Sequence, residues 1–120
     1  MAGSATKIAV YYLPFSAETF APVTVDTIEA EAVCSFRFEP SADEAAQLLD
    51  WFARSGDGGF DGKRVRLKLT GLEAADLYVD ADGGLRRGRK EPGRLEPEAF
   101  RALETFIEQA ARRAGCDPHD

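Results

Sequence analysis

Histidine and cysteine are scarce in this chain of 120 residues, which contains one histidine and two cysteines. Zinc usually needs three or four Cys or His ligands, so these few side chains do not predict a metal centre. Two cysteines also fall short of a disulfide framework, and we expect Cys34 and Cys116 to be reduced thiols in a reducing compartment. His119 lies at the C-terminal end, where a frayed chain cannot hold the geometry that nucleophilic catalysis with Cys116 would need. The sequence therefore predicts a protein without catalytic residues, metal or cofactor.

Long apolar runs are absent as well. No run approaches the roughly 18 residues that a membrane span requires, and no basic segment followed by an apolar one opens the chain. We therefore expect a cytoplasmic protein without a membrane partner. The length and the apolar content of 44% suit a single domain. We expect a disordered lead-in over residues 1–5, one domain over 6–116 and a frayed tail over 117–120.

Positive charge is in the minority, with 15 Lys and Arg against 21 Asp and Glu and a net charge of −6. This balance disfavours nonspecific binding to nucleic acid, because attraction to phosphate needs a positive surface. Residues 1–62 hold three basic and ten acidic side chains, whereas residues 63–90 hold eight basic and four acidic ones. These charges predict an acidic surface near the first helices and a basic stripe on the following strands. They are either solvated faces or a surface that steers a partner of opposite charge.

The apolar pattern predicts the secondary structure. Strand signals lie at 7–13, 33–39, 65–70, 76–80 and 85–90, with a tight turn at Asp82-Gly83-Gly84. Ser41-Ala42-Asp43-Glu44 is a capping box, followed by a helix of about 14 residues that Gly56 should end. A second main helix begins at Pro97 and ends before Gly115. Together with a short helix over 24–31, these elements predict an α+β fold: a mostly antiparallel sheet of about five strands, with two main helices packed on one face and one short extra helix.

A few side chains are candidates for contact with a partner. Asp26, Glu29 and Glu31 concentrate negative charge on the short helix. Trp51 lies beside the apolar stripe of its helix, where it either caps the core or forms an aromatic anchor of the kind found at interface hot spots. Reversing the charges of Glu29 and Glu31 should change stability by no more than about 0.5 kcal/mol, as is usual for surface substitutions. The partner-binding site that the sequence predicts thus consists of Asp26, Glu29, Glu31 and Trp51.

The order of elements resembles the small cytoplasmic immunity proteins of bacterial toxin systems. The resemblance rests on a first strand that ends in Leu13-Pro14-Phe15, a small helix after Thr24, a capped helix after Pro40, and a basic hairpin before a final amphipathic helix. It implies neutralisation by stoichiometric binding, with a basic toxin domain such as a nuclease as the protein partner.

Two further hypotheses stand beside this one. The first is another protein-interaction module, such as an adaptor, a secretion chaperone or a homodimer formed through an exposed edge strand. The second is an enzyme or a small-ligand-binding domain with a pocket of carboxylate and tyrosine side chains.

Overall fold

The computed structural model describes residues 7–119, so the lead-in expected over residues 1–5 lies outside the described part of the chain. The elements, in chain order, are β1 (Ile8–Tyr12), α1 (Ile28–Glu31), β2 (Cys34–Phe38), α2 (Ala42–Ala53), β3 (Ser55–Gly56), β4 (Val65–Thr70), β5 (Leu77–Asp80), β6 (Gly84–Arg87), β7 (Gly93–Leu95) and α3 (Pro97–Arg113). Among the described residues, no helix combines the length and the apolar character that a membrane span requires.

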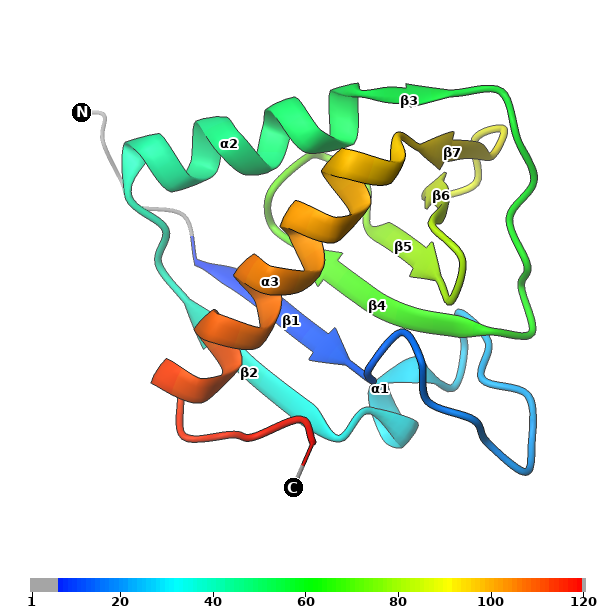
Figure 1. Cartoon of the computed structure of the whole chain (residues 1–120), viewed down its shortest axis with the longest axis horizontal. Helices are drawn as coiled ribbons and strands as arrows, with labels where there is room; N and C mark the ends of the chain where they lie inside the picture. The colour runs from blue at the N-terminus through cyan, green and yellow to red at the C-terminus, as the bar shows by residue number, and fades with distance from the viewer. Residues whose placement is uncertain (1–6, 120) are drawn as a thin grey trace.

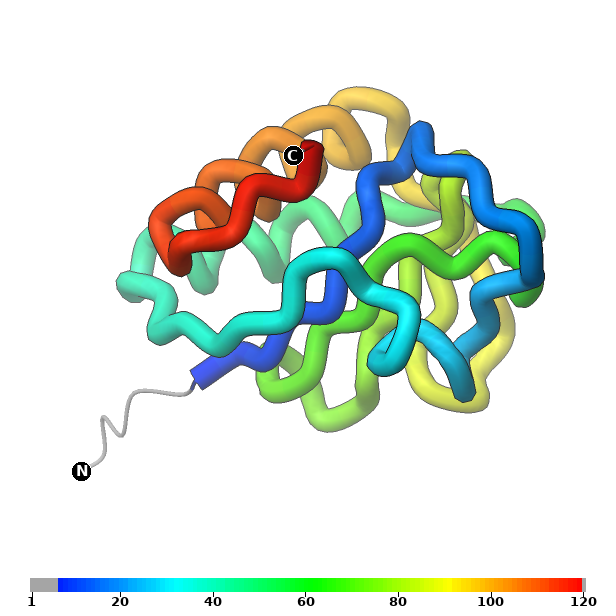
Figure 2. The backbone as a smooth tube through the Cα atoms, turned by 90° about the horizontal axis from the view of Figure 1, so that it is seen from below, coloured from blue at the N-terminus to red at the C-terminus, as the bar shows by residue number. Residues whose placement is uncertain are grey.

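One antiparallel sheet organises the molecule, with the strand order β2-β1-β4-β5-β6-β7-β3. The helices α2 and α3 cover one face of the sheet, and α1 packs against β1 and β4 on the other face (Figures 1 and 2). The α+β class and the antiparallel sheet predicted from the sequence are therefore confirmed.

The main core lies between the sheet and the two long helices. Alternate residues of β1, namely Ile8, Val10 and Tyr12, point into it and are almost completely buried. They meet Leu48 of α2 and Ile107 of α3, which are both fully buried. A smaller core on the opposite face holds four buried residues: Leu13, Val23, Ile28 and Val65. The sheet therefore has apolar packing on both faces.

Helix starts follow the local sequence signals for α2 and α3, whereas the short helix expected over 24–31 begins only at Ile28, after a turn. The capping box is present, because the Glu44 N–H donates to Ser41 Oγ at 3.1 Å and the Ser41 N–H donates to the Glu44 carboxylate at 2.9 Å. Pro97 stands at the start of α3, and Gly115 follows its end with a φ of +89°. A positive φ costs glycine little, so the chain can turn back over the helix at this point.

The sequence prediction was wrong at Gly56 and in the number of strands. Gly56 has no positive φ and does not stop a helix; α2 ends at Ala53, and Gly56 enters β3. There it pairs with β7, at a point where a Cβ on Gly93 would lie 2.8 Å from the Gly56 carbonyl oxygen. The sheet has seven strands where about five were expected. The strands β3 and β7 have only two and three residues and contain glycine, so they show no apolar alternation that could have predicted them.

The expectation of free thiols was also wrong. Cys34 and Cys116 form a disulfide with a Cα–Cα distance of 5.9 Å. The tail expected over 117–120 runs beside α3 as far as it is described: Pro118 is buried, and His119 Nε2 lies 2.7 Å from Glu108 Oε2. Packing of α3 across the sheet brings its end next to β2, which no local pattern in the sequence could indicate.

Candidate protein-binding surface

The acidic residues predicted for partner binding lie in one short segment, which a hydroxyl-capped turn organises. Thr24 Oγ1 accepts a hydrogen bond from the Asp26 N–H at 3.2 Å, and Thr27 Oγ1 accepts one from the Thr24 N–H at 2.8 Å. Ile28 anchors the segment in the smaller core. Asp26 and Glu31 are left exposed to solvent. We call residues 24–31 the acidic turn.

Glu29 differs from its two acidic neighbours because it pairs within the chain. Its carboxylate accepts a hydrogen bond from Lys68 Nζ. Lys68 also lies 3.9 Å from Asp76 and sits over the rings of Tyr11 and Tyr78, at 5.8 and 5.6 Å from their centroids. Only 11% of the Lys68 side chain is exposed. Glu29 therefore holds α1 on the sheet, and its charge is largely compensated.

The ionisation of Lys68 reflects the same arrangement. Burial by itself acts to lower the pKa of Lys68, because it disfavours the charged form. The hydrogen bond with Glu29 and the charge interactions with Tyr78, Glu29 and Asp76 act in the opposite direction, and the pKa lies above its ordinary value. Lys68 is thus held as a cation in this contact.

Trp51 lies apart from the acidic turn. It belongs to α2, on the face of the sheet opposite α1, and it packs against the main core. Its ring meets Phe106 of α3 edge-on, with the centroids 5.8 Å apart. The structure therefore does not bring Trp51 together with Asp26, Glu29 and Glu31, and its position matches the core-capping interpretation.

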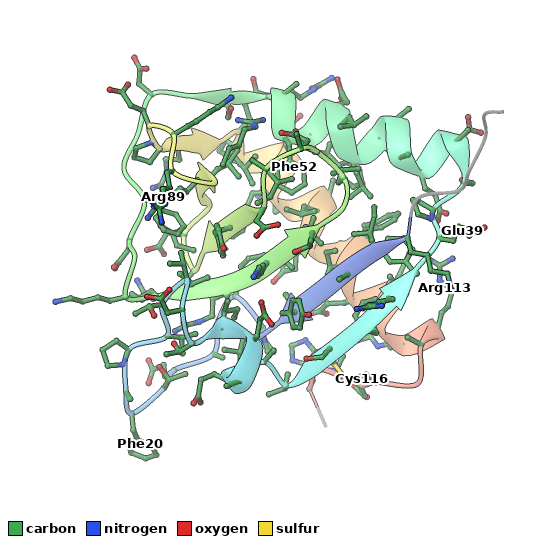
Figure 3. All side chains as sticks on the ribbon, turned by 180° about the vertical axis from the view of Figure 1, so that it is seen from behind. Phe20, Glu39, Phe52, Arg89, Arg113 and Cys116 are labelled. Carbon is green, nitrogen blue, oxygen red and sulfur yellow. A yellow bond between two sulfur atoms is a disulfide. The ribbon has the colours of Figure 1, made fainter. Side chains whose placement is uncertain are left out.

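An aromatic side chain that the sequence reasoning passed over is fully exposed on the loop that precedes the acidic turn in the chain. Phe20 stands at the tip of the loop between β1 and α1, with a relative exposure of 114% (Figure 3). Thr19 Oγ1 donates to the Ala21 carbonyl at 2.6 Å, which stiffens the tip. A phenylalanine inside a segment without apolar periodicity and directly before Ala21-Pro22 was the available signal. Such a ring has no apolar neighbours at strand or helix spacing with which it could pack into a core.

Both ends of this loop are fixed to the sheet. At one end, the Arg66 guanidinium donates to the Ala17 carbonyl through Nε at 3.2 Å and Nη2 at 2.9 Å. At the other end, the Val23 N–H donates to the Lys63 carbonyl at 3.1 Å, and the Val65 N–H donates to the Val23 carbonyl at 2.9 Å. Phe20 is thus presented on a loop whose ends are held by hydrogen bonds.

The predicted pairing of the basic strand with the following hairpin is present, but its basic stripe is not an open charged face. β4 pairs with β5, and β5 pairs with β6. Arg66 is 2% exposed, Arg64 is paired with Asp82 at 2.9 Å, and Arg87 is paired with Glu73 at 3.0 Å. Most of these cations are thus engaged in contacts within the chain. The expectation of a solvent-facing basic stripe on β4 was therefore wrong at Arg66.

A second cluster joins carboxylate, tyrosine and histidine side chains beside α3. Glu108 Oε2 accepts a hydrogen bond from the Tyr12 hydroxyl at 2.8 Å, in addition to its contact with His119. Burial raises the pKa of Tyr12, and the hydrogen bond with Glu108 raises it further. Burial followed by the charge of Glu108 also raises the pKa of Glu104. Since Tyr12 is fully buried, this cluster ties β1 and the C-terminal segment to α3.

Within residues 7–119, no group of three or more His, Cys, Asp or Glu side chains could hold a metal ion. The Asp80 carboxylate, next to the predicted turn, accepts hydrogen bonds from the backbone N–H groups of Asp61, Asp82 and Gly84 at 2.7 to 2.8 Å. It therefore organises the hairpin turn itself.

Comparison with known proteins gives no match, whether to family models, to curated proteins or to solved structures.

Proposed function

We propose that this chain is a non-catalytic protein-binding protein that neutralises a cognate bacterial toxin by stoichiometric binding, as the immunity proteins it resembles do. The observation that carries the proposal is the fully exposed Phe20 on a fixed loop that runs directly into the acidic turn. An exposed aromatic ring has no stabilising role in the free protein, whereas aromatic side chains dominate the binding energy of many interfaces. A loop that is already ordered also loses less conformational entropy on binding.

The exposed acids of the acidic turn, which follows the Phe20 loop in the chain, support a partner with a basic surface. Asp26 and Glu31 are exposed, and neither is in ion-pair contact with the described residues. Exposed charges of one sign mainly raise the rate of association with an oppositely charged partner and select against others. A toxin domain with a basic substrate groove, such as a nuclease, has the complementary surface. Blocking such a groove requires no catalytic groups on this chain.

The compartment is part of the proposal. A protein of this type acts in the cytoplasm, where thioredoxin and glutathione keep thiols reduced, whereas the Cys34–Cys116 disulfide is typical of oxidising compartments. The proposal therefore requires that the chain with both thiols reduced still folds and binds. Alkylation of free thiols in intact cells, followed by a gel-shift assay, measures which form is present.

Co-expression tests the function directly. The reading frame next to the gene for this chain is expressed alone and together with it, and growth is measured. We expect growth arrest from the neighbour alone, rescue by co-expression, and a complex of equal stoichiometry by size-exclusion chromatography with light scattering. A neighbour that causes no arrest, or an arrest that this chain does not relieve, would contradict the proposal. A stable dimer of the free chain would favour the homodimer alternative.

Two matched pairs of variants test the surface. Phe20→Ala should weaken the complex by about tenfold or more, the range expected for a hot-spot aromatic residue, while Leu49→Ala, which truncates an exposed apolar residue on α2, should not. Asp26→Lys should slow association, while Asp57→Lys makes the same charge change at an exposed position in another loop. If neither Phe20→Ala nor Asp26→Lys weakens a complex that does form, the interface lies elsewhere.

A further inference from the structure

A hollow of about 440 Å³ opens between the Phe20 loop and the start of β4. Residues 17–22 form one side, and Lys63, Arg64 and Arg66 contribute to the other. The only carboxylate in the lining is that of Glu18, which is exposed. Three cationic side chains thus meet at a concave place in a chain whose net charge is −6.

Arg66 is the unusual member of this group. The residue is 2% exposed, and its guanidinium donates only to neutral carbonyl oxygens, those of Ala17 and Val65. No carboxylate in residues 7–119 lies within ion-pair distance of it. A guanidinium has five N–H donors, and these contacts use three of them. A buried charge is costly unless a counter-charge compensates it, and this one has spare donors for such a partner.

The nearby carboxylates are engaged in other contacts. Asp82 pairs with Arg64 at 2.9 Å. Asp80 accepts three backbone N–H groups, and Asp61 accepts the N–H of Lys63 at 3.0 Å. Burial and then the charge of Arg64 lower the pKa of Arg66. The negative charges of Asp61, Asp80 and Asp82 act in the opposite direction but do not cancel this effect. Among the described residues, Arg66 therefore has no carboxylate in direct contact, although the charges of Asp61, Asp80 and Asp82 act on it from farther away.

We propose that this hollow is a binding site for an oxyanion of the phosphate class, held by Arg66 and Arg64 from the sheet and by Lys63 at the rim. Several acceptor oxygens and a charge of about two at neutral pH suit phosphate to a site with several donors from different side chains. The hollow shares the Phe20 loop with the proposed toxin-binding surface, but phosphate binding requires no protein partner and is tested on the free chain.

Inorganic phosphate is the probe, and the full chain is titrated with it in two-dimensional NMR at constant ionic strength, with chloride as the balancing anion. We expect saturable shifts of the backbone amides of residues 17–23 and of the Arg66 Nε–H signal. Acetate at the same concentration should produce smaller shifts. The proposal fails if phosphate acts no differently from chloride, if acetate binds equally well, or if the shifts are spread over all basic residues.

A matched pair of charge reversals locates the site. Lys63→Glu should weaken phosphate binding by about tenfold, the effect of reversing one nearby charge, without unfolding the protein, since the described contacts of Lys63 use its backbone. Lys90→Glu makes the same change at another exposed lysine and should leave binding unchanged. Equal loss in both variants would show a nonspecific effect of net charge and would overturn the proposal. Arg66→Gln should abolish the shifts, with circular dichroism as the check on its fold.

Discussion

Cys34, the first residue of the edge strand β2, is bonded through its sulfur to Cys116, which lies 82 positions later and just beyond the end of α3. The bond closes a loop that contains both long helices and every strand except β1. It also fixes the edge of the sheet to the C-terminal segment, in which His119 contacts Glu108 of α3.

Removing this disulfide should lower the free energy of unfolding by up to about 4 kcal/mol, because the cross-link restricts the unfolded chain over a long loop. Urea denaturation of the wild type with and without a phosphine reductant measures the loss. The double variant Cys34→Ser and Cys116→Ser should behave like the reduced protein, and reductant should not change it further. Equal stability of the oxidised and reduced wild type would contradict the cross-link.

Leu48→Ala should cost about 2 to 5 kcal/mol, because the side chain is fully buried between α2 and the rest of the main core and its removal leaves a cavity. Ile107→Ala on α3 should cost a similar amount for the same reason. The neighbouring Leu49→Ala provides the control, since Leu49 is 43% exposed and should lose no more than about 0.5 kcal/mol. Thermal and urea unfolding compare the three variants.

Glu29 and Glu31 should respond differently to charge reversal. The sequence predicts little effect for both, but the hydrogen bond from Lys68 to Glu29 changes this expectation. Glu29→Lys should lower the free energy of unfolding by about 1 kcal/mol, because it places a second cation beside a largely buried one. Glu31→Lys, with no such contact among the described residues, should stay within about 0.5 kcal/mol. A similar loss in both variants would show that the Lys68 contact does not hold α1 in solution.

Glu104→Gln should raise the melting temperature at neutral pH. The pKa of Glu104 is raised in the folded state, so the folded protein holds its proton more tightly than the unfolded chain does. This group therefore favours folding at pH values below its ordinary pKa of 4.5, and that contribution is lost as the pH rises through the folded-state value. The advantage of the variant should disappear below about pH 4. An advantage that is constant across the pH range would contradict the raised pKa.

Local signals predicted much of the fold. A run of β-branched and aromatic residues located the strand around Ile8, apolar alternation located the strand around Leu67, and the Ser41–Glu44 capping box located α2. The short strands β3 and β7 were not predicted, because strands of two or three residues are defined by the strands they pair with and have no apolar pattern of their own. The misplaced stop at Gly56 has the same origin: that glycine serves a strand contact with Gly93.

The candidate surface was predicted only in part. Charge content singled out the acidic turn, and the structure leaves Asp26 and Glu31 exposed on it. Charge content could not show that Glu29 would meet Lys68, which lies 39 positions away in the sequence. Nor could composition rank Phe20 above Trp51 as an exposed ring, since exposure depends on which elements cover a residue.

The sequence by itself determined the fold class, the positions of the main strands and helices, and the surplus of negative charge, because these follow from neighbouring residues and from composition. Only the tertiary structure decided that Cys34 would meet Cys116, that Arg66 would be buried and that Phe20 would be exposed. Each of these depends on the distance between residues far apart in the chain, and packing of the helices and loops on the sheet sets that distance.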